Sequence, residues 1–225
     1  MRLGLMGGTF NPIHYGHLAS ANEVCESFAL DRIMFVPVAM PPHKELTEII
    51  APHHRVMMTT LATIMHPRFM VSSVEIDRSG ASYTVDTVAQ LKHLHQDLAA
   101  IYFIVGIDAF LEIATWRQPD ALLRSCHTIV TSRPGYNLRE LALSTLRQLS
   151  QMYPHLTFEP LTRNQPMDSP SFQVRGTSYQ IHLHKVSGLD ISSTEIRQRV
   201  KTRQSICYLL PDSVDAYIRK YQLYS

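Results

Sequence analysis

Two histidines, His14 and His17, lie three positions apart in the segment GGTFNPIHYGH, directly after a short apolar stretch. Imidazoles can donate hydrogen bonds to an anion, exchange protons or bind a metal. The preceding Gly7 and Gly8 let the backbone approach a ligand closely, and N–H groups at the start of a following helix favour an anion. An isolated H-x-x-H pair is usually structural, but its place after a strand that ends in two glycines favours a phosphate site.

A second segment with chemical potential is DISSTEIRQRV, near the end of the chain. Ser192 and Glu195 form an ordinary helix capping box, and Arg197 follows within one turn, where its guanidinium could bind phosphate. Lys44, after two prolines and His43, is a third cationic candidate.

Metal binding is a weaker interpretation of the histidines. The pairs at 53–54, 93 and 95, and 182 and 184 are adjacent or two apart, and they form no closed set of four ligands. We therefore expect no structural zinc and no metal held by the protein alone.

The composition indicates a small cytoplasmic protein. The 225 residues are 45% hydrophobic, enough for one sizeable core. The net charge of +2 comes from mixed charges, which excludes a nucleic-acid-binding or membrane-binding tail. Three cysteines fit reduced, buried thiols, and no apolar run is long enough for a signal peptide or a membrane span.

Alternating strand and helix patterns must position these residues. Short apolar runs predict strands at 2–6, 32–37, 69–74, 101–105 and 127–131, with helices at about 17–29, 53–65, 84–98 and 107–113. This order predicts an α/β fold, a doubly wound, Rossmann-like parallel sheet with helices on both faces. Ligands of such sheets bind at the carboxyl ends of the strands, where the strand order reverses. The segment after the first strand lies at that edge.

The second half of the chain gives a weaker pattern. We expect an exposed helix at 137–151, a long loop at 160–178, a strand at 179–185 and a last helix near 211–222. The chain is interpreted as a single domain, 1–225, with 190–225 as a C-terminal helical subregion.

The two segments together resemble the nucleotidylyltransferase superfamily, whose signature G-x-F-x-P-x-H-x-G-H matches GGTFNPIHYGH and whose I-S-S-T-x-I-R element matches 191–197. Further segments are similar to the nicotinate-nucleotide adenylyltransferase family: VPVAMPPHK, ASYTVDT, FIVGIDAF, TW and SRPGY. The resemblance extends from Met1 to about residue 200, with nothing recognised at 137–189. Many members carry Asp where this chain has Asn11, which questions any carboxylate role there.

The resemblance implies attack of the 5′-phosphate of nicotinate mononucleotide on the α-phosphorus of ATP, with release of pyrophosphate and without a covalent intermediate. It implies catalytic roles for four cationic or imidazole side chains, with His17 nearest the α-phosphate: His14, His17, Lys44 and Arg197. The implied ATP-binding residues are Gly7, Gly8, Thr9, Phe10, Gly106, Asp108, Ile191, Ser192, Ser193 and Thr194.

The resemblance also implies a nicotinate mononucleotide site made of Tyr83, Thr84, Trp116 and Arg133. Trp116 would stack on the pyridine ring, although a packing role is the alternative. The backbone N–H groups of Tyr83 and Thr84 would hold the carboxylate at a helix start. Asp108 would accept from a ribose hydroxyl, or it would cap a helix, or both.

The expected cofactor is Mg²⁺ brought with ATP, and the expected partners are ATP and nicotinate mononucleotide. Neither nucleic acid nor a membrane is expected, and a homo-oligomer is left open. Two other functions remain as alternatives. One is another superfamily enzyme, such as the phosphopantetheine adenylyltransferase, which lacks the SYT and Trp116 context. The other is a silent nucleotide sensor, which the intact cationic set argues against.

Overall fold

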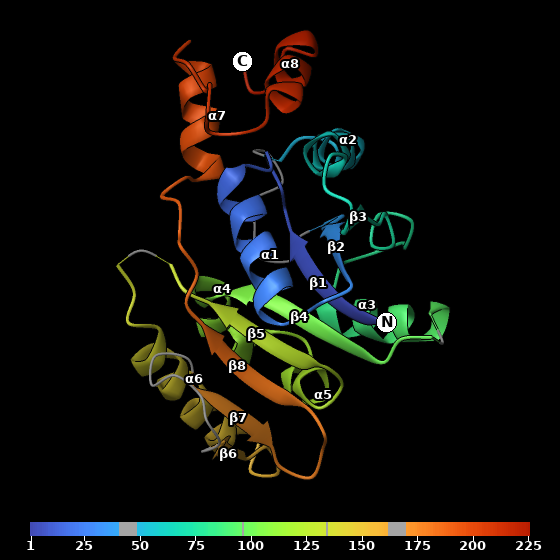
Figure 1. The fold of residues 1–225 in the computed structure, drawn as a ribbon, viewed down its shortest axis with the longest axis vertical. Coiled ribbons are helices and arrows are strands. Elements are labelled where there is room, and N and C mark those ends of the chain that lie inside the picture. Colours follow the sequence, from blue (N-terminus) through green and yellow to red (C-terminus); the bar gives the residue numbers. More distant parts are fainter. Residues whose placement is uncertain (41–48, 96, 134, 162–169) are drawn as a thin grey trace.

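The computed structural model describes residues 1–40, 49–95, 97–133, 135–161 and 170–225 (Figure 1). An eight-stranded sheet, in the order β3-β2-β1-β4-β5-β8-β7-β6, forms the centre of the molecule. Its strands are β1 (Arg2–Gly8), β2 (Arg32–Pro37), β3 (Phe69–Val71), β4 (Ala100–Gly106), β5 (His127–Thr131), β6 (Phe158–Leu161), β7 (Ser171–Val174) and β8 (Gln180–His184).

The sheet is parallel except at one end. Strands β1 to β5 and β8 pair in parallel, whereas β7 pairs antiparallel with both β8 and β6. The chain builds outward from β1 through β2 and β3, then returns to the other side of β1 with β4. The strand order therefore reverses between β1 and β4, which is where a doubly wound sheet binds ligands.

Helices cover both faces of the sheet, and each face has its own hydrophobic cluster. Apolar side chains of α1, α2, α7 and α8 belong to one cluster, and those of α3 to α6 belong to the other. Figure 1 shows α1 in front of β1, with α7 and α8 beyond its end. The helices are α1 (Tyr15–Ser27), α2 (Pro52–Thr63), α3 (Thr84–Leu94), α4 (Ile107–Leu111), α5 (Pro119–Leu123), α6 (Leu138–Met152), α7 (Ser193–Lys201) and α8 (Asp212–Lys220).

Burial on both faces explains the continuous apolar runs of the central strands. In β1, Leu3 and Leu5 belong to one cluster while Met6 belongs to the other. Side chains alternate between faces along a strand, so a strand covered on both sides needs apolar residues at successive positions. This pattern made the central strands predictable.

The predicted Rossmann-like α/β class is confirmed, and strands 32–37 and 127–131 have the predicted bounds. The other predicted strands and helices are present with ends that differ by a few residues, and β3 keeps only 69–71 of the expected 69–74. The helix at 107–113 is shorter than expected, because α4 ends at Leu111 and a 3-10 turn follows at Ile113–Thr115.

Two predictions for the second half of the chain were wrong. The 160–178 segment contributes β7 and the end of β6, because two short strands with few alternating apolar residues can pair at a sheet edge. Helix α6 is not simply exposed, since Leu138, Ala142 and Leu149 are buried against the sheet. Helix α5 was not predicted.

Among the described residues, no helix is long and apolar enough to cross a membrane. Cys25 and Cys126 are buried free thiols, and Cys207 is an exposed one. Burial raises the pKa of Cys126 to about 12, so this thiol stays protonated and inert.

Candidate active site

A cavity of about 650 Å³ opens at the carboxyl ends of β1 and β4. Gly7 and Gly106 end these two strands, and a Cβ at either position would meet nothing within 4 Å. Both glycines therefore expose bare backbone to the cavity, which lets a flat or bulky ligand approach the sheet edge closely. The predicted location, at the reversal of strand order, is the observed one.

The loop after β1 is shaped from inside by Phe10. This side chain is 2% exposed, has φ of 47°, and packs its ring against Phe35 and His17. A Cβ on Gly8 would lie 2.8 Å from the same ring, so only glycine fits there. Phe10 was predicted to bind ATP, but it does not line the cavity, and it shapes the loop from beneath.

His14 and His17 lie together on the cavity wall, with ring centroids 3.7 Å apart. The backbone N–H of His14 donates to Nδ1 of His17 at 3.3 Å. When His17 is neutral, this bond makes Nδ1 the acceptor and places the ring proton on Nε2. His17 is thereby prepared to donate from Nε2.

Burial, together with the nearby charge of Arg133, lowers the pKa of His14 to about 4. His14 is only 6% exposed, so its imidazole is neutral near pH 7 in this structure. His14 would therefore gain a proton only beside the negative charge of a bound phosphate.

Asn11 fastens the loop after β1 through hydrogen bonds on the side away from the cavity. Its side-chain oxygen accepts a hydrogen bond from the Tyr224 hydroxyl at 2.9 Å and from the Ile50 N–H at 3.4 Å. Asn11 is buried and is not among the residues that line the cavity. An amide oxygen makes these bonds as well as a carboxylate oxygen would, and this explains why Asn is accepted where many members of the resembled family have Asp.

A buried arginine joins three loops around this wall. Arg55 is 0% exposed and donates to the carbonyl oxygens of Thr9, Ala39 and Ile50 at 2.9, 3.1 and 3.2 Å. Burial lowers its pKa from the usual arginine value. Arg55 was not predicted as a structural residue, because an arginine within a helix pattern gives no sign that it is buried.

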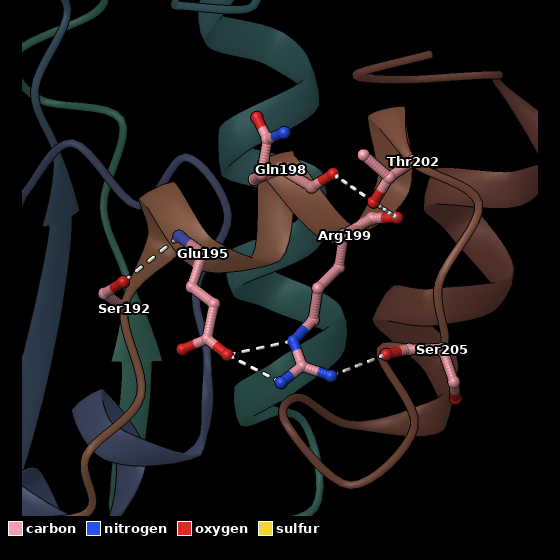
Figure 2. Close-up of polar contacts among 6 residues, drawn as sticks. All are labelled: Ser192, Glu195, Gln198, Arg199, Thr202 and Ser205. Atoms are coloured by element: carbon pink, nitrogen blue, oxygen red, sulfur yellow. Dashed lines mark hydrogen bonds and ion pairs between the residues drawn. The ribbon is translucent and has the colours of Figure 1, made fainter.

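The start of α7 lies at the same end of the cavity as the two histidines. We call this end the phosphate end, because phosphate binding is predicted for its residues Gly7, Gly8, His14, His17 and 192–194. The Ser192 hydroxyl accepts a hydrogen bond from the Glu195 N–H at 3.1 Å, so the Ser192 half of the predicted capping box is present (Figure 2). The Glu195 carboxylate contacts Arg199 at 2.7 and 2.9 Å, which leaves it turned along the helix. The first N–H groups of α7 lack intrahelical partners and adjoin the cavity at Ser193 and Thr194.

Two side chains of α7 fasten the loop after β1. Ser193 Oγ donates to the Pro12 carbonyl at 2.8 Å, and Arg197 donates to the Asn11 carbonyl at 3.0 Å. Arg197 does not line the cavity. Arg197 thus braces the loop that carries His14 and His17, the histidine loop, and its predicted contact with phosphate stays a prediction.

Asp108 and Arg133, predicted for different substrates, form an ion pair at the cavity wall. The Asp108 carboxylate raises the pKa of Arg133. Asp108 Oδ1 is buried and has no hydrogen-bond partner among the described residues. This oxygen is the acceptor that a ribose hydroxyl would need.

The opposite end of the cavity is formed by the start of α3 and by Trp116. Tyr83 precedes α3, and no described side chain caps the helix at Thr84. Trp116 packs its edge on Phe103, with centroids 6.0 Å apart, and is half-buried. Its packing against Phe103 is compatible with its place on the cavity wall, and stacking on a pyridine ring stays a prediction.

A buried carboxyl at this end was not predicted. Glu75 is 5% exposed and lines the cavity close to Ser82 and Thr87. Its Oε1 accepts from the Thr87 hydroxyl at 2.7 Å. Neither a hydrophobic period nor a motif marks Glu75, because the segment 72–82 between β3 and α3 is irregular.

Most of the predicted binding residues meet around this one cavity. Those that line it are Gly7, Gly8, Thr9, His14, His17, Tyr83, Thr84, Gly106, Asp108, Trp116, Arg133, Ile191, Ser192, Ser193 and Thr194. Phe10 and Arg197 lie behind the wall, and Lys44 lies outside the described residues.

Comparison with known proteins identifies the family of this chain. The model of the family described as Cytidylyltransferase-like matches residues 5–199. The chain belongs to this cytidylyltransferase-like family. The match contains both the histidine loop and the start of α7, which are the two walls of the phosphate end.

Curated relatives indicate which group of enzymes within the family this chain resembles. A protein of Moorella thermoacetica named "Probable nicotinate-nucleotide adenylyltransferase" is 45% identical over 223 residues, covering 99% of this chain and 91% of its own length. One of Thermoanaerobacter sp. with the same name is 41% identical and covers 100% and 94%. The resemblance to nicotinate-nucleotide adenylyltransferases is thereby confirmed.

Among solved structures, the Plasmodium falciparum nicotinic acid mononucleotide adenylyltransferase complexed with NaAD superposes with a TM-score of 0.72. It is 20% identical and covers 99% of this chain and 97% of its own. At that identity the likeness supports the cytidylyltransferase-like fold alone.

Proposed function

We propose that this chain transfers the adenylyl group of ATP to nicotinate mononucleotide, giving nicotinate adenine dinucleotide and pyrophosphate in NAD biosynthesis. The observation that carries the proposal is that one cavity joins the histidine loop and α7 to the start of α3 and Trp116. A donor and an acceptor nucleotide can therefore meet in it. The full-length relatives, named for this reaction, support the same assignment.

The reaction needs positioning and charge stabilisation more than covalent chemistry, because a phosphate oxygen is already a nucleophile. ATP would lie with its phosphates between the two histidines and the N–H groups at the start of α7. His17 Nε2–H would donate to the α-phosphate as charge develops there. His14, neutral at rest, would gain a proton as the phosphates approach, because a nearby anion favours the imidazolium.

The acceptor would occupy the other end. Trp116 would carry the pyridine ring, and the N–H groups at the start of α3 would hold its carboxylate. Asp108 would accept from a ribose hydroxyl, and Arg133 would face the mononucleotide phosphate. In-line attack then requires only that both phosphates be held at the middle of the cavity.

Mg²⁺ is proposed to arrive with ATP. Among the described residues, no three His, Cys, Asp or Glu side chains gather as a cation site. Mg²⁺ keeps several waters and binds phosphates readily, so this donor set fits an ion held by the substrate. The ion would neutralise part of the triphosphate charge. A chelator should abolish activity, and Mg²⁺ but not Zn²⁺ should restore it.

The test is pyrophosphate release from ATP with nicotinate or nicotinamide mononucleotide, side by side. Charge-assisted hydrogen bonds to the carboxylate contribute about 1.5 kcal/mol or more, so kcat/KM should favour the acid at least about tenfold. Thr84→Pro, which removes one donor, should reduce that preference. Equal use of both would contradict the acid site and leave adenylyl transfer standing, whereas no release with either would contradict the whole proposal.

Location and association are further parts of the proposal. We propose a cytoplasmic enzyme, in keeping with its free thiols and with a substrate, ATP, that is abundant in the cytoplasm. A homo-oligomer stays open, and a sedimentation measurement would decide it.

A further inference from the structure

Glu75 is a buried carboxyl in a wall of the cavity that the proposed reaction does not use. It belongs to the segment between β3 and α3, and its side chain is 5% exposed. Oε1 contacts the Thr87 hydroxyl at 2.7 Å, while Oε2 is buried with no hydrogen-bond partner among the described residues. An unpaired buried carboxylate oxygen is costly, so such a group normally has a ligand, a proton or both.

The surroundings of Glu75 connect it to the start of α3. Thr87 Oγ1 also lies 3.3 Å from the Tyr83 carbonyl oxygen, one turn earlier in the helix. Ser82, Tyr83, Thr84 and Thr87 line the cavity together with Glu75. The carboxyl group therefore lies next to the helix start that would hold the pyridine substituent.

No described cation contacts Glu75 directly. Arg78 reaches Thr87 Oγ1 at 3.1 Å and Gln90 at 3.1 Å, and it acts on Glu75 only through the hydroxyl and at longer range. On α3, Asp86 is paired with Arg117, whose guanidinium lies 4.6 Å from the centre of the Tyr83 ring. Burial raises the pKa of Glu75 above its usual value, and the hydrogen bonds and Arg78 only partly oppose this.

We infer that Glu75 is a specificity-determining residue whose proton selects the pyridine substituent. As a neutral carboxyl, it leaves the donors at the start of α3 available to a carboxylate. As a carboxylate, it repels the acid through their like charges and leaves the neutral amide unaffected. This inference rests on the proposed function.

The two mononucleotides provide an internal reference. They share the same pyridine ring, ribose and phosphate, so titration of the phosphate or of the histidines cancels in the ratio of their kcat/KM values. Only the titration of a group that interacts differently with a carboxylate and an amide can change this ratio with pH. The ratio of acid to amide should fall by at least about fivefold as pH rises through the ionisation of Glu75, because two like charges about 4 Å apart repel by that factor even in bulk water and more strongly beside protein.

Glu75→Gln tests this directly, because glutamine keeps an acceptor for Thr87 and cannot ionise. Its acid-to-amide ratio should be independent of pH and should exceed that of the wild type at alkaline pH. Asp77→Asn is the matched control, since Asp77 is an exposed carboxylate of the same segment that hydrogen-bonds Ser73. This control should keep the wild-type pH dependence.

Thr87→Val provides a second variant if glutamine prevents folding. It removes the hydroxyl that donates to Glu75, so the fall in ratio should move to higher pH. A wild-type ratio that does not change with pH would overturn the inference, and so would a Glu75→Gln enzyme with the wild-type slope. If the wild type uses the acid but the ratio is flat, the proposed function stands and only the role of Glu75 fails.

Discussion

The two ends of the cavity are built differently. The phosphate end is held by backbone and buried side chains: Arg55, Asn11 and α7 fix the histidine loop through carbonyl and amide groups. The pyridine end is formed by a helix start, a half-buried tryptophan and a carboxyl with one unpaired oxygen. Rigid donors suit a charge that develops in the transition state, whereas adjustable groups suit the choice between similar substrates.

The largest effect is expected at the phosphate end. His17→Ala should lower kcat by about 10²–10³, because it removes a donor that acts on the transition state. The fold should survive, since the side chain lines a cavity. Steady-state kinetics and thermal unfolding of the same sample measure both, and near-normal turnover would remove His17 from the mechanism.

Arg55→Met tests whether the hydrogen bonds of this buried arginine stabilise the phosphate end. Three carbonyl oxygens would lose their donor, so the free energy of unfolding should fall by about 3 kcal/mol. Urea titration measures it. The exposed Arg139 on α6 provides the control, and Arg139→Met should change stability by less than about 0.5 kcal/mol. Equal losses in the two variants would refute the bracing role.

Trp116→Ala tests the pyridine end. Stacking of a base on an aromatic ring contributes about 1–3 kcal/mol, so KM for the mononucleotide should rise about tenfold while KM for ATP hardly changes. As Trp116 is the sole tryptophan, mononucleotide binding should also quench the intrinsic fluorescence. If both KM values rise alike, the residue only packs against Phe103.

Acidification should gradually lower the free energy of unfolding through His14. The pKa of His14 is lowered from 6.5 to about 4, so between these values the unfolded chain binds a proton that the folded chain refuses. Stability contributed by neutral His14 is complete above pH 6.5 and is lost as pH falls toward 4, by about 1.4 kcal/mol per pH unit. Urea titrations at several pH values should show a smaller slope in His14→Gln. An unchanged slope would contradict the neutral, buried imidazole.

His182 provides a reference for this measurement, because it is a second, partly buried histidine outside the cavity lining. Its pKa is also lowered to about 4, by burial and by the neighbouring His127 and His184, but it does not line the cavity. Added ATP should therefore reduce the contribution of His14 and leave that of His182, which His182→Gln would remove. If ATP flattens the entire slope, the two histidines are not independent.

The phosphate end was largely predictable from sequence. Gly7, His14 and His17 must follow one another closely, because a strand end, a turn and a helix start fix their spacing, and local spacing is visible in a sequence. Burial is not visible in the same way. Phe10 was therefore predicted as a ligand contact, although the structure shows its side chain packed beneath the loop.

The pyridine end and the sheet edge illustrate what sequence could not provide. Glu75 becomes notable only when the fold removes it from water, and no local pattern marks that. Strands β6 and β7 are stabilised by pairing with partners distant in sequence, so their own residues resemble a loop. Both failures concern properties that arise from tertiary contacts.

The hydrogen bond from Tyr224 to Asn11 joins positions 213 apart in the chain. On the ribosome, the histidine loop is made early but lacks this contact until Tyr224, 213 positions later, has been synthesised. Loop closure over such a distance must wait for the intervening sheet to bring the ends together. A growing chain would therefore present an unfinished phosphate site, and nucleotide binding would report the completion of folding.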